Sequence, residues 1–176
     1  MATTEAVLPF EHHLREFCGA RGSDIDALSA MFLLFRTNTD ATAAMEAASL
    51  RPLSLTHAGF VLLMTLWTMG PQETRQLASV QRVSKPSIVS SVDTLERAGF
   101  VRRIRSEADR RLVTVELTSD GAAIVERAQQ AWHACEREIA GVLTTEEQRA
   151  FAAMLRKLQT ATQAGCGAAM RDGRTG

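Results

Sequence analysis

The pattern that most constrains the fold is a change of hydrophobic period at Gly99. Between Ser84 and Gly99 the apolar residues recur every three or four positions, which is typical of a helix with one buried face. Ser84 stands where an N-cap belongs, and Gly99 ends the helix. The segments 100–106 and 112–118 then carry the β-branched and apolar content of two short strands. The sequence therefore predicts a helix followed directly by a β-hairpin.

Another helix precedes this one. Residues 73–81 have the pattern of a short helix, and a turn at 82–84 separates it from the next. Two helices joined by a tight turn form a helix-turn-helix, and a hairpin directly after them is a wing. The expected fold class is mainly α with a small two- to three-stranded antiparallel wing. It is a winged helix-turn-helix plus terminal dimerisation helices.

Long helices are expected on both sides of this centre. Their segments are 24–48, 57–69, 119–143 and 145–161, after a short helix at 9–17. Residues 51–56 form a break, the expected N-caps are Ser23 or Asp24 and Thr56, and Thr144 with Glu147 offers a capping box for the last helix. The terminal helices have buried faces that one small winged domain cannot cover, so we expect a homodimer. The expected domains are N-terminal dimerisation helices at 1–55, a winged helix-turn-helix at 56–118, C-terminal dimerisation helices at 119–162, and a disordered tail at 163–176.

Positive charge is concentrated in one stretch of a neutral chain. The formal net charge is zero, yet residues 82–111 hold eight Lys or Arg against four acids. A basic segment in an otherwise acidic chain favours contact with a polyanion, although a charge run is also typical of a solvated face. Five arginines lie within 102–111, and packing does not explain arginines at a hairpin tip. Arginine suits a narrow minor groove or bidentate phosphate contacts.

The helix at 85–99 and the hairpin together predict double-stranded DNA as the partner. The face opposite the buried stripe carries short polar side chains and one valine, which suit the major groove. The predicted DNA-binding residues are Ser84, Lys85, Pro86, Ser87, Val89, Ser90, Asp109, Arg110 and Arg111. Asp109 is expected to orient an arginine rather than to contact DNA. A solvated helix face remains the alternative interpretation for the helix residues.

These stretches resemble the MarR family of bacterial transcription regulators. The similarity lies in residues 53–63, 77–103 and 109–121, which include an acid followed by two arginines and the L-T-x-x-G exit from the wing. The resemblance extends over about residues 24–162. It implies an obligate homodimer that reads a palindromic operator, and a small-molecule pocket between the DNA-binding and dimerisation parts.

Two positions depart from the family pattern. Many relatives have glycine in the helix-turn-helix turn, where this chain has Arg82. A positive φ at a non-glycine residue would cost about 1 kcal/mol, unless the turn differs. Relatives often carry a longer polar residue at the position of Ser90, so base preferences cannot be transferred.

An effector pocket follows from aromatic residues around one cation. Aromatic walls with a single cation suit an aromatic carboxylate, a phenolate or a related thioester. The predicted ligand-binding residues are Phe32, Arg36, His57, Phe60, Met64, Trp67, Trp132 and His133. The alternative is an ordinary dimer core in which Arg36 pairs with Asp40 four residues on. The expected function is a repressor released from its operator by such a ligand.

Other regulator types of the same fold stay open. A metal-responsive regulator would use His12, His13, Cys18, His133 and Cys135, but their spacings match no strong zinc signature. A redox-responsive regulator would use Cys18, although the chain has no tyrosine to surround the thiol as in the family's peroxide sensors. No metal or cofactor is therefore expected.

Two further classes are weighed against a regulator. An enzyme would need a nucleophile with its base, a metal site or a phosphate-binding glycine loop, and no such motif is found, so no catalytic residue is expected. A winged-helix module for protein binding would need an apolar recognition helix.

The apolar runs are too short to span a bilayer, the start lacks a secretory pattern, and the three cysteines are widely spaced. A cytoplasmic protein without membrane contact is expected.

Overall fold

A computed structural model of the chain describes residues 9–105 and 113–164. The chain divides into two compact units, Met1–His133 and Ala134–Gly176, which are described separately. The fold class is confirmed: the structure is mostly helical, with one small antiparallel sheet. In the described part no single helix could cross a membrane; a pair bent by 74°, Ile25–Leu53 with His57–Met69, would pass by length and composition only.

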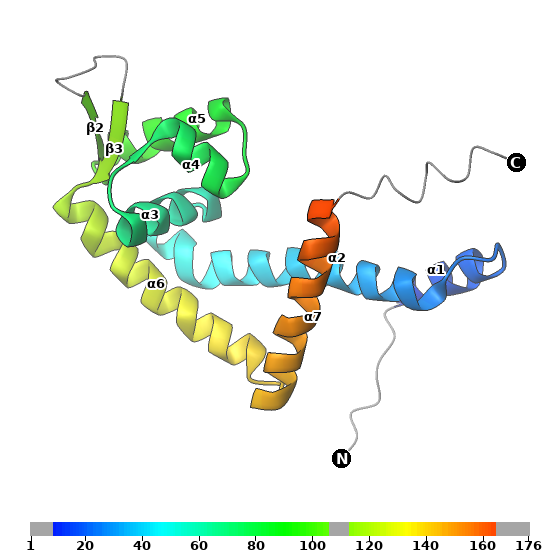
Figure 1. Cartoon of the computed structure of the whole chain (residues 1–176). Helices are drawn as coiled ribbons and strands as arrows, with labels where there is room; N and C mark the ends of the chain where they lie inside the picture. The colour runs from blue at the N-terminus through cyan, green and yellow to red at the C-terminus, as the bar shows by residue number, and fades with distance from the viewer. Residues whose placement is uncertain (1–8, 106–112, 165–176) are drawn as a thin grey trace, which may run out of the picture. The chain divides into compact units, whose positions relative to one another are not determined.

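The elements follow the expected order (Figure 1). They are α1 (Pro9–Gly19), α2 (Ile25–Met45), a π-helical turn (Glu46–Leu50), a 3-10 turn (Arg51–Leu53), α3 (His57–Met69), β1 (Gln72–Glu73), α4 (Thr74–Gln81), α5 (Lys85–Arg97), β2 (Val101–Arg105), β3 (Val113–Leu117), α6 (Ser119–Ala140) and α7 (Thr145–Ala164).

Several boundaries differ from those expected. The break expected at 51–56 is shorter, because helical winding continues through Leu53. Pro52 lies in the first turn of the 3-10 helix, where its missing N–H removes no hydrogen bond. Helix α6 ends at Ala140 rather than 143, and α7 continues to Ala164, into the segment expected to be a disordered tail. Residues 165–176 of that tail lie outside the described residues.

The predicted helix starts are confirmed by their capping bonds. The Asp24 carboxylate accepts from the N–H groups of Asp26 and Ala27, at 3.1 and 3.0 Å. Thr56 Oγ1 accepts from the Gly59 N–H at 3.1 Å, and Ser84 Oγ accepts from the Ser87 N–H at 3.3 Å. Each bond satisfies an N–H group that has no partner within its own helix.

The wing has three strands in the order β1-β3-β2, all antiparallel. Val101 pairs with Leu117 and Arg105 with Val113, while the two-residue β1 pairs with the other edge of β3. Figure 1 shows α4 and α5 next to α3 and beside the wing strands. The core between these elements is closed: Leu62, Leu63, Leu77, Val92 and Val115 are all 0% exposed.

Helix α6 is attached to the base of the wing through the L-T-x-x-G segment. Thr118 Oγ1 donates to the carbonyl of Gly99 at 2.7 Å and accepts from the Gly121 N–H at 3.0 Å. A Cβ at Gly121 would lie 1.9 Å from the Phe100 carbonyl oxygen, so only glycine permits this approach. The threonine of the motif is therefore explained by its two hydrogen bonds, and the glycine by the close approach of the Phe100 carbonyl.

The second unit contains the end of α6 and all of α7. The predicted capping box is present: the Thr144 N–H donates to Glu147 at 2.7 Å, and the Glu147 N–H donates to Thr144 Oγ1 at 3.3 Å. The bonds that Glu147 accepts from the backbone and hydroxyl of Thr144 lower the pKa of this carboxyl group. Within residues 145–163 of α7, the part whose burial is described, none is buried.

Candidate nucleic-acid interface

Helix α5 presents a polar face opposite its buried stripe. Ile88, Val92 and Leu95 form the stripe and are at most 4% exposed, as predicted. The six residues proposed from the sequence on the other side are all exposed: Ser84, Lys85, Pro86, Ser87, Val89 and Ser90. The hydroxyl groups of Ser84 and Ser87 lie 2.8 Å apart and share a hydrogen bond. Short hydroxyl side chains, one ammonium group and one valine give a surface that can enter a major groove.

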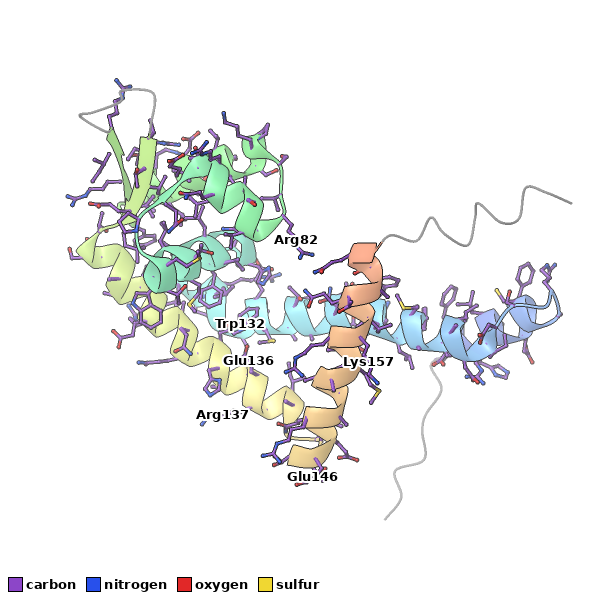
Figure 2. All side chains as sticks on the ribbon, in the orientation of Figure 1. Arg82, Trp132, Glu136, Arg137, Glu146 and Lys157 are labelled. Carbon is purple, nitrogen blue, oxygen red and sulfur yellow. The ribbon has the colours of Figure 1, made fainter. Side chains whose placement is uncertain are left out.

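The turn between α4 and α5 contains a left-handed arginine. Arg82 has φ 54° and ψ 39°, so the structure has the positive φ expected where relatives carry glycine. Its N–H donates to the carbonyl of Ser79 at 3.3 Å and closes the end of α4. Figure 2 shows the Arg82 side chain projecting away from the two helices. The turn therefore has the geometry of a helix-turn-helix despite the missing glycine.

The base of the wing contains an ion cluster that sequence reasoning missed. Arg103 of β2 pairs through its guanidinium group with both Asp93 and Glu96 of α5. Its backbone N–H also donates to Glu96, at 3.1 Å. Burial acts to lower the pKa of Arg103, but the hydrogen bonds and charges of the two carboxylates outweigh it and raise this pKa. The sequence signal that could have indicated this cluster is the pair Asp93 and Glu96, two acids three positions apart on one helix.

This cluster narrows the basic surface that the charge count suggested. Arg103 is balanced by two acids, and Arg102 pairs with Glu116 across the sheet. The described cations near α5 without an ion pair are Arg82, Lys85, Arg97 and Arg105. The predicted wing-tip residues Asp109, Arg110 and Arg111 lie outside the described residues.

Three of the predicted ligand-binding residues lie together. The rings of His57 and Trp132 are stacked with centroids 5.4 Å apart, and the Phe60 ring lies 5.3 Å from that of Trp132. Phe60 is 5% exposed, and Met64 is partly buried against the same core. The aromatic group at the junction of α3 and α6 thus comprises His57, Phe60 and Trp132.

The other predicted ligand residues have separate surroundings. Arg36 Nε donates to the Asp40 carboxylate at 2.8 Å, which is the ion pair that the sequence left as an alternative. Phe32 packs against Phe10 with ring centroids 5.6 Å apart, and Trp67 is exposed. His133 is also exposed, one position after Trp132.

A separate hollow lies between α3 and α5. Its volume is about 230 Å³, and polar side chains such as Thr56, Ser90, Ser91 and Thr94 line it. Within the described residues, no three His, Cys, Asp or Glu side chains are placed to hold a metal ion. Cys18 and Cys135 are both free thiols.

Comparison with known proteins assigns the family. The MarR family model matches residues 55–113, which run from two residues before α3 to the first residue of β3. An HTH-type transcriptional regulator of Bacillus subtilis strain 168, YwaE, is 30% identical over 135 residues, covering 77% of this chain and 79% of that protein.

Two solved structures give the same result. A mutant of MarR from E. coli, crystallised with operator DNA, is 27% identical with a TM-score of 0.69, covering 77% of this chain and 99% of that one. Bordetella bronchiseptica BpsR, in a structure concerned with regulation of its DNA binding by 6-hydroxynicotinic acid, is 25% identical with a TM-score of 0.67, covering 74% of this chain and 98% of that one. The matched proteins are transcription regulators rather than enzymes. The chain therefore belongs to the MarR family of winged helix-turn-helix transcription regulators.

Proposed function

We propose that this protein is a homodimeric repressor that binds a palindromic operator and is released by a small aromatic acid, phenol or thioester. The observation that carries the DNA-binding part is the exposed polar face of α5, held beside a wing whose two long strands pair in register. The helix would enter the major groove, and Arg110 and Arg111 would contact the backbone or minor groove.

The dimer is supported by apolar residues that the described residues of their own compact unit leave uncovered. In α7, Phe151, Met154 and Leu158 are between 40% and 57% exposed and recur at helical spacing. In α1 and α2, Phe10, Phe17 and Phe35 are at least 60% exposed. Exposed apolar patches of this kind are typical of protein–protein interfaces. A two-fold dimer would place two α5 helices on one duplex.

The operator part is tested by selection from a randomised duplex library. We expect an inverted repeat with half-site centres about 10 bp apart, since two subunits related by a two-fold axis read one turn each. Lys85→Ala or Ser87→Ala should change the preferred base at one position per half-site, by roughly 1–3 kcal/mol. Arg111→Ala should weaken all sequences and reduce the salt slope by about 0.9 per subunit. Recovery of unrelated, non-palindromic sequences would refute this part.

The effector part rests on the aromatic group His57, Phe60 and Trp132. A ligand that inserts beside these rings and favours a spacing of the two wings unsuited to DNA lowers operator affinity by its differential affinity, commonly 1–3 kcal/mol. The BpsR relative makes 6-hydroxynicotinic acid a reasonable first probe, with benzoic acid as a second.

Tryptophan fluorescence tests the effector part, because the chain has two tryptophans, Trp67 and Trp132. We expect the probes to quench the wild type and to release it from the selected duplex, and Trp132→Phe to lose the quenching. Arg36 is the cation proposed from the sequence for the ligand's anionic group, although in the structure it pairs with Asp40 apart from the three rings. If it serves that role, Arg36→Ala should abolish release and keep DNA binding, whereas Asp40→Ala, which removes the partner and keeps the cation, should retain release. An unchanged response in Arg36→Ala would leave Arg36 as a structural partner of Asp40.

Repression itself is tested with a reporter gene placed behind the selected operator. Expression should fall when the protein is present and recover when the effective probe is added. A rise in expression on adding the protein alone would make it an activator, because the same DNA contacts serve either outcome.

A further inference from the structure

The ion cluster at Arg103 joins the recognition helix to the wing. Asp93 and Glu96 lie in the second half of α5, and Arg103 is the central residue of β2. One terminal nitrogen of the guanidinium group contacts Asp93 and the other contacts Glu96. The backbone N–H of Arg103 contacts Glu96 as well, at 3.1 Å. Arg103 therefore joins β2 to α5 through three hydrogen bonds.

Arg103 is not placed as a DNA contact. Its two terminal nitrogens are both engaged with carboxylates, and its side chain is only 27% exposed. The neighbouring Arg102 differs, because its side chain is 66% exposed and pairs with Glu116 within the sheet. The two arginines lie side by side in the sequence and have opposite surroundings, so Arg102 is a natural control.

The connection that Arg103 reinforces is short. Helix α5 ends at Arg97 and β2 begins at Val101, and Gly99 between them has φ 79°. A guanidinium group is planar and its donors form a rigid fork, so two bound carboxylates fix both distance and angle. Recognition by a helix and a wing at once needs such a fixed relation, since groups that act together must be held by supporting contacts.

We propose that Arg103 is a positioning residue for DNA recognition, which holds the wing strand β2 at the orientation that the recognition helix α5 requires. The proposal rests on the DNA-binding function proposed above. Loss of the bridge lets the wing and helix move independently, so contacts of the wing no longer support those of the helix. The effect falls on the preference for the operator more than on general attraction to DNA.

The experiment compares affinity for the duplex selected by the wild type with affinity for an unrelated duplex of equal length. The ratio of the two affinities should fall about tenfold in Arg103→Ala, as for residues that couple two contacts. Arg102→Ala removes an equal charge from the same strand and should leave the ratio unchanged. An unchanged ratio in Arg103→Ala, or an equal fall in both variants, would overturn the proposal.

A coupling measurement separates positioning from simple stability. Arg105 is exposed at the end of β2, and Arg105→Ala should weaken operator binding in the wild type but add little in the Arg103→Ala background. Additive losses would contradict the proposal, because distant independent groups add. If Arg103→Ala does not fold, Arg103→Lys takes its place. Its single ammonium group keeps the charge without the fork, and it should give an intermediate ratio; a wild-type ratio would overturn the need for the fork.

A triple substitution tests whether Arg103 only neutralises the two acids. Asp93→Asn, Glu96→Gln and Arg103→Ala together remove the bridge without leaving uncompensated carboxylates near DNA. The ratio should stay as low as in Arg103→Ala. Recovery of the wild-type ratio would show that Arg103 only neutralises the acids. Failure of the wild type to select any duplex would instead contradict the proposed DNA-binding function itself.

Discussion

The winged-helix core buries its apolar residues, whereas helix α7 leaves its apolar residues exposed. We call the first the closed region and the second the open region. In the core, Leu62, Leu77 and Val115 are completely enclosed by helices and strands of the same chain. Among residues 145–163 of α7 none is buried, and Phe151, Met154 and Leu158 are at least 40% exposed along one side of the helix. Both regions are amphipathic in sequence, so the difference lies in what each unit supplies: the core residues are covered within their own unit, whereas the described residues of Ala134–Gly176 leave the apolar side of α7 uncovered.

This difference separates two sources of stability. The core can form within one chain, because every large apolar side chain in it already has neighbours that exclude water. The apolar side of α7 gains the same free energy only when another surface covers it. We therefore expect mutations in the core to act on folding at any protein concentration, and mutations in α7 to act on assembly.

The largest expected effect is on the closed region. Gly121→Ala would place a Cβ 1.9 Å from the Phe100 carbonyl oxygen, so α6 must move off the base of the wing. We expect a loss of about 3 kcal/mol in the free energy of unfolding, at the upper end for overpacking. Urea denaturation followed by circular dichroism measures this loss. Ala123→Ser, exposed on the same turn of α6, should change stability by less than about 0.5 kcal/mol.

The next effect is on the open region. Phe151→Glu places a charge at the centre of the apolar side of α7, and a central aromatic anchor is worth about 2 kcal/mol or more in an interface. Light scattering at micromolar concentration should then show the mass of one chain, 19.2 kDa, where the wild type shows twice that. Ala153→Glu adds the same charge on the opposite side of α7 and should leave the dimer intact. A wild type that is already monomeric would contradict the closed-versus-open comparison.

Features set by neighbouring residues could be predicted from the sequence. The caps at Asp24, Thr56 and Ser84 are correct because a capping bond joins residues two or three positions apart. The buried stripe of α5 is correct because helical spacing alone decides which side chains share a face. The winged helix-turn-helix followed from joining such local segments in order.

Features set by distance in space could not be predicted. The charge count of segment 82–111 included Arg102 and Arg103 among its cations, whereas both are paired within the protein. That pairing needs α5 folded back along β2, and no local pattern specifies it. The aromatic group was only partly identified, because helical spacing placed Arg36 on the apolar side of α2 but could not show that Asp40 holds it.

A smaller effect on the stability of the closed region is expected at Ser84, the N-cap of helix α5. Ser84→Ala removes the acceptor for the Ser87 N–H at the start of α5 and the hydroxyl bonded to Ser87. We expect a loss of about 1 kcal/mol in the free energy of unfolding, as for other N-cap substitutions. Ser84→Asp, which keeps an acceptor, should retain most of that stability. Equal destabilisation by both substitutions would mean that the loss of stability does not come from the missing acceptor for the Ser87 N–H.

The smallest expected effect is at Arg82, where the closed region retains local strain. A Cβ in the left-handed conformation costs about 1 kcal/mol, and the structure has this conformation with φ 54°. Arg82→Gly removes that cost, but the greater freedom of glycine in the unfolded chain returns about 0.5–1 kcal/mol. The net gain in the free energy of unfolding should therefore be a few tenths of a kcal/mol.

Arg82→Ala removes the same charge and keeps the Cβ, so it should be less stable than Arg82→Gly. Identical urea midpoints for the two variants would show that the turn relaxes around any side chain. A more stable Arg82→Gly that also binds DNA less tightly, with a smaller salt slope, would mean that the arginine is kept in a strained turn for its charge.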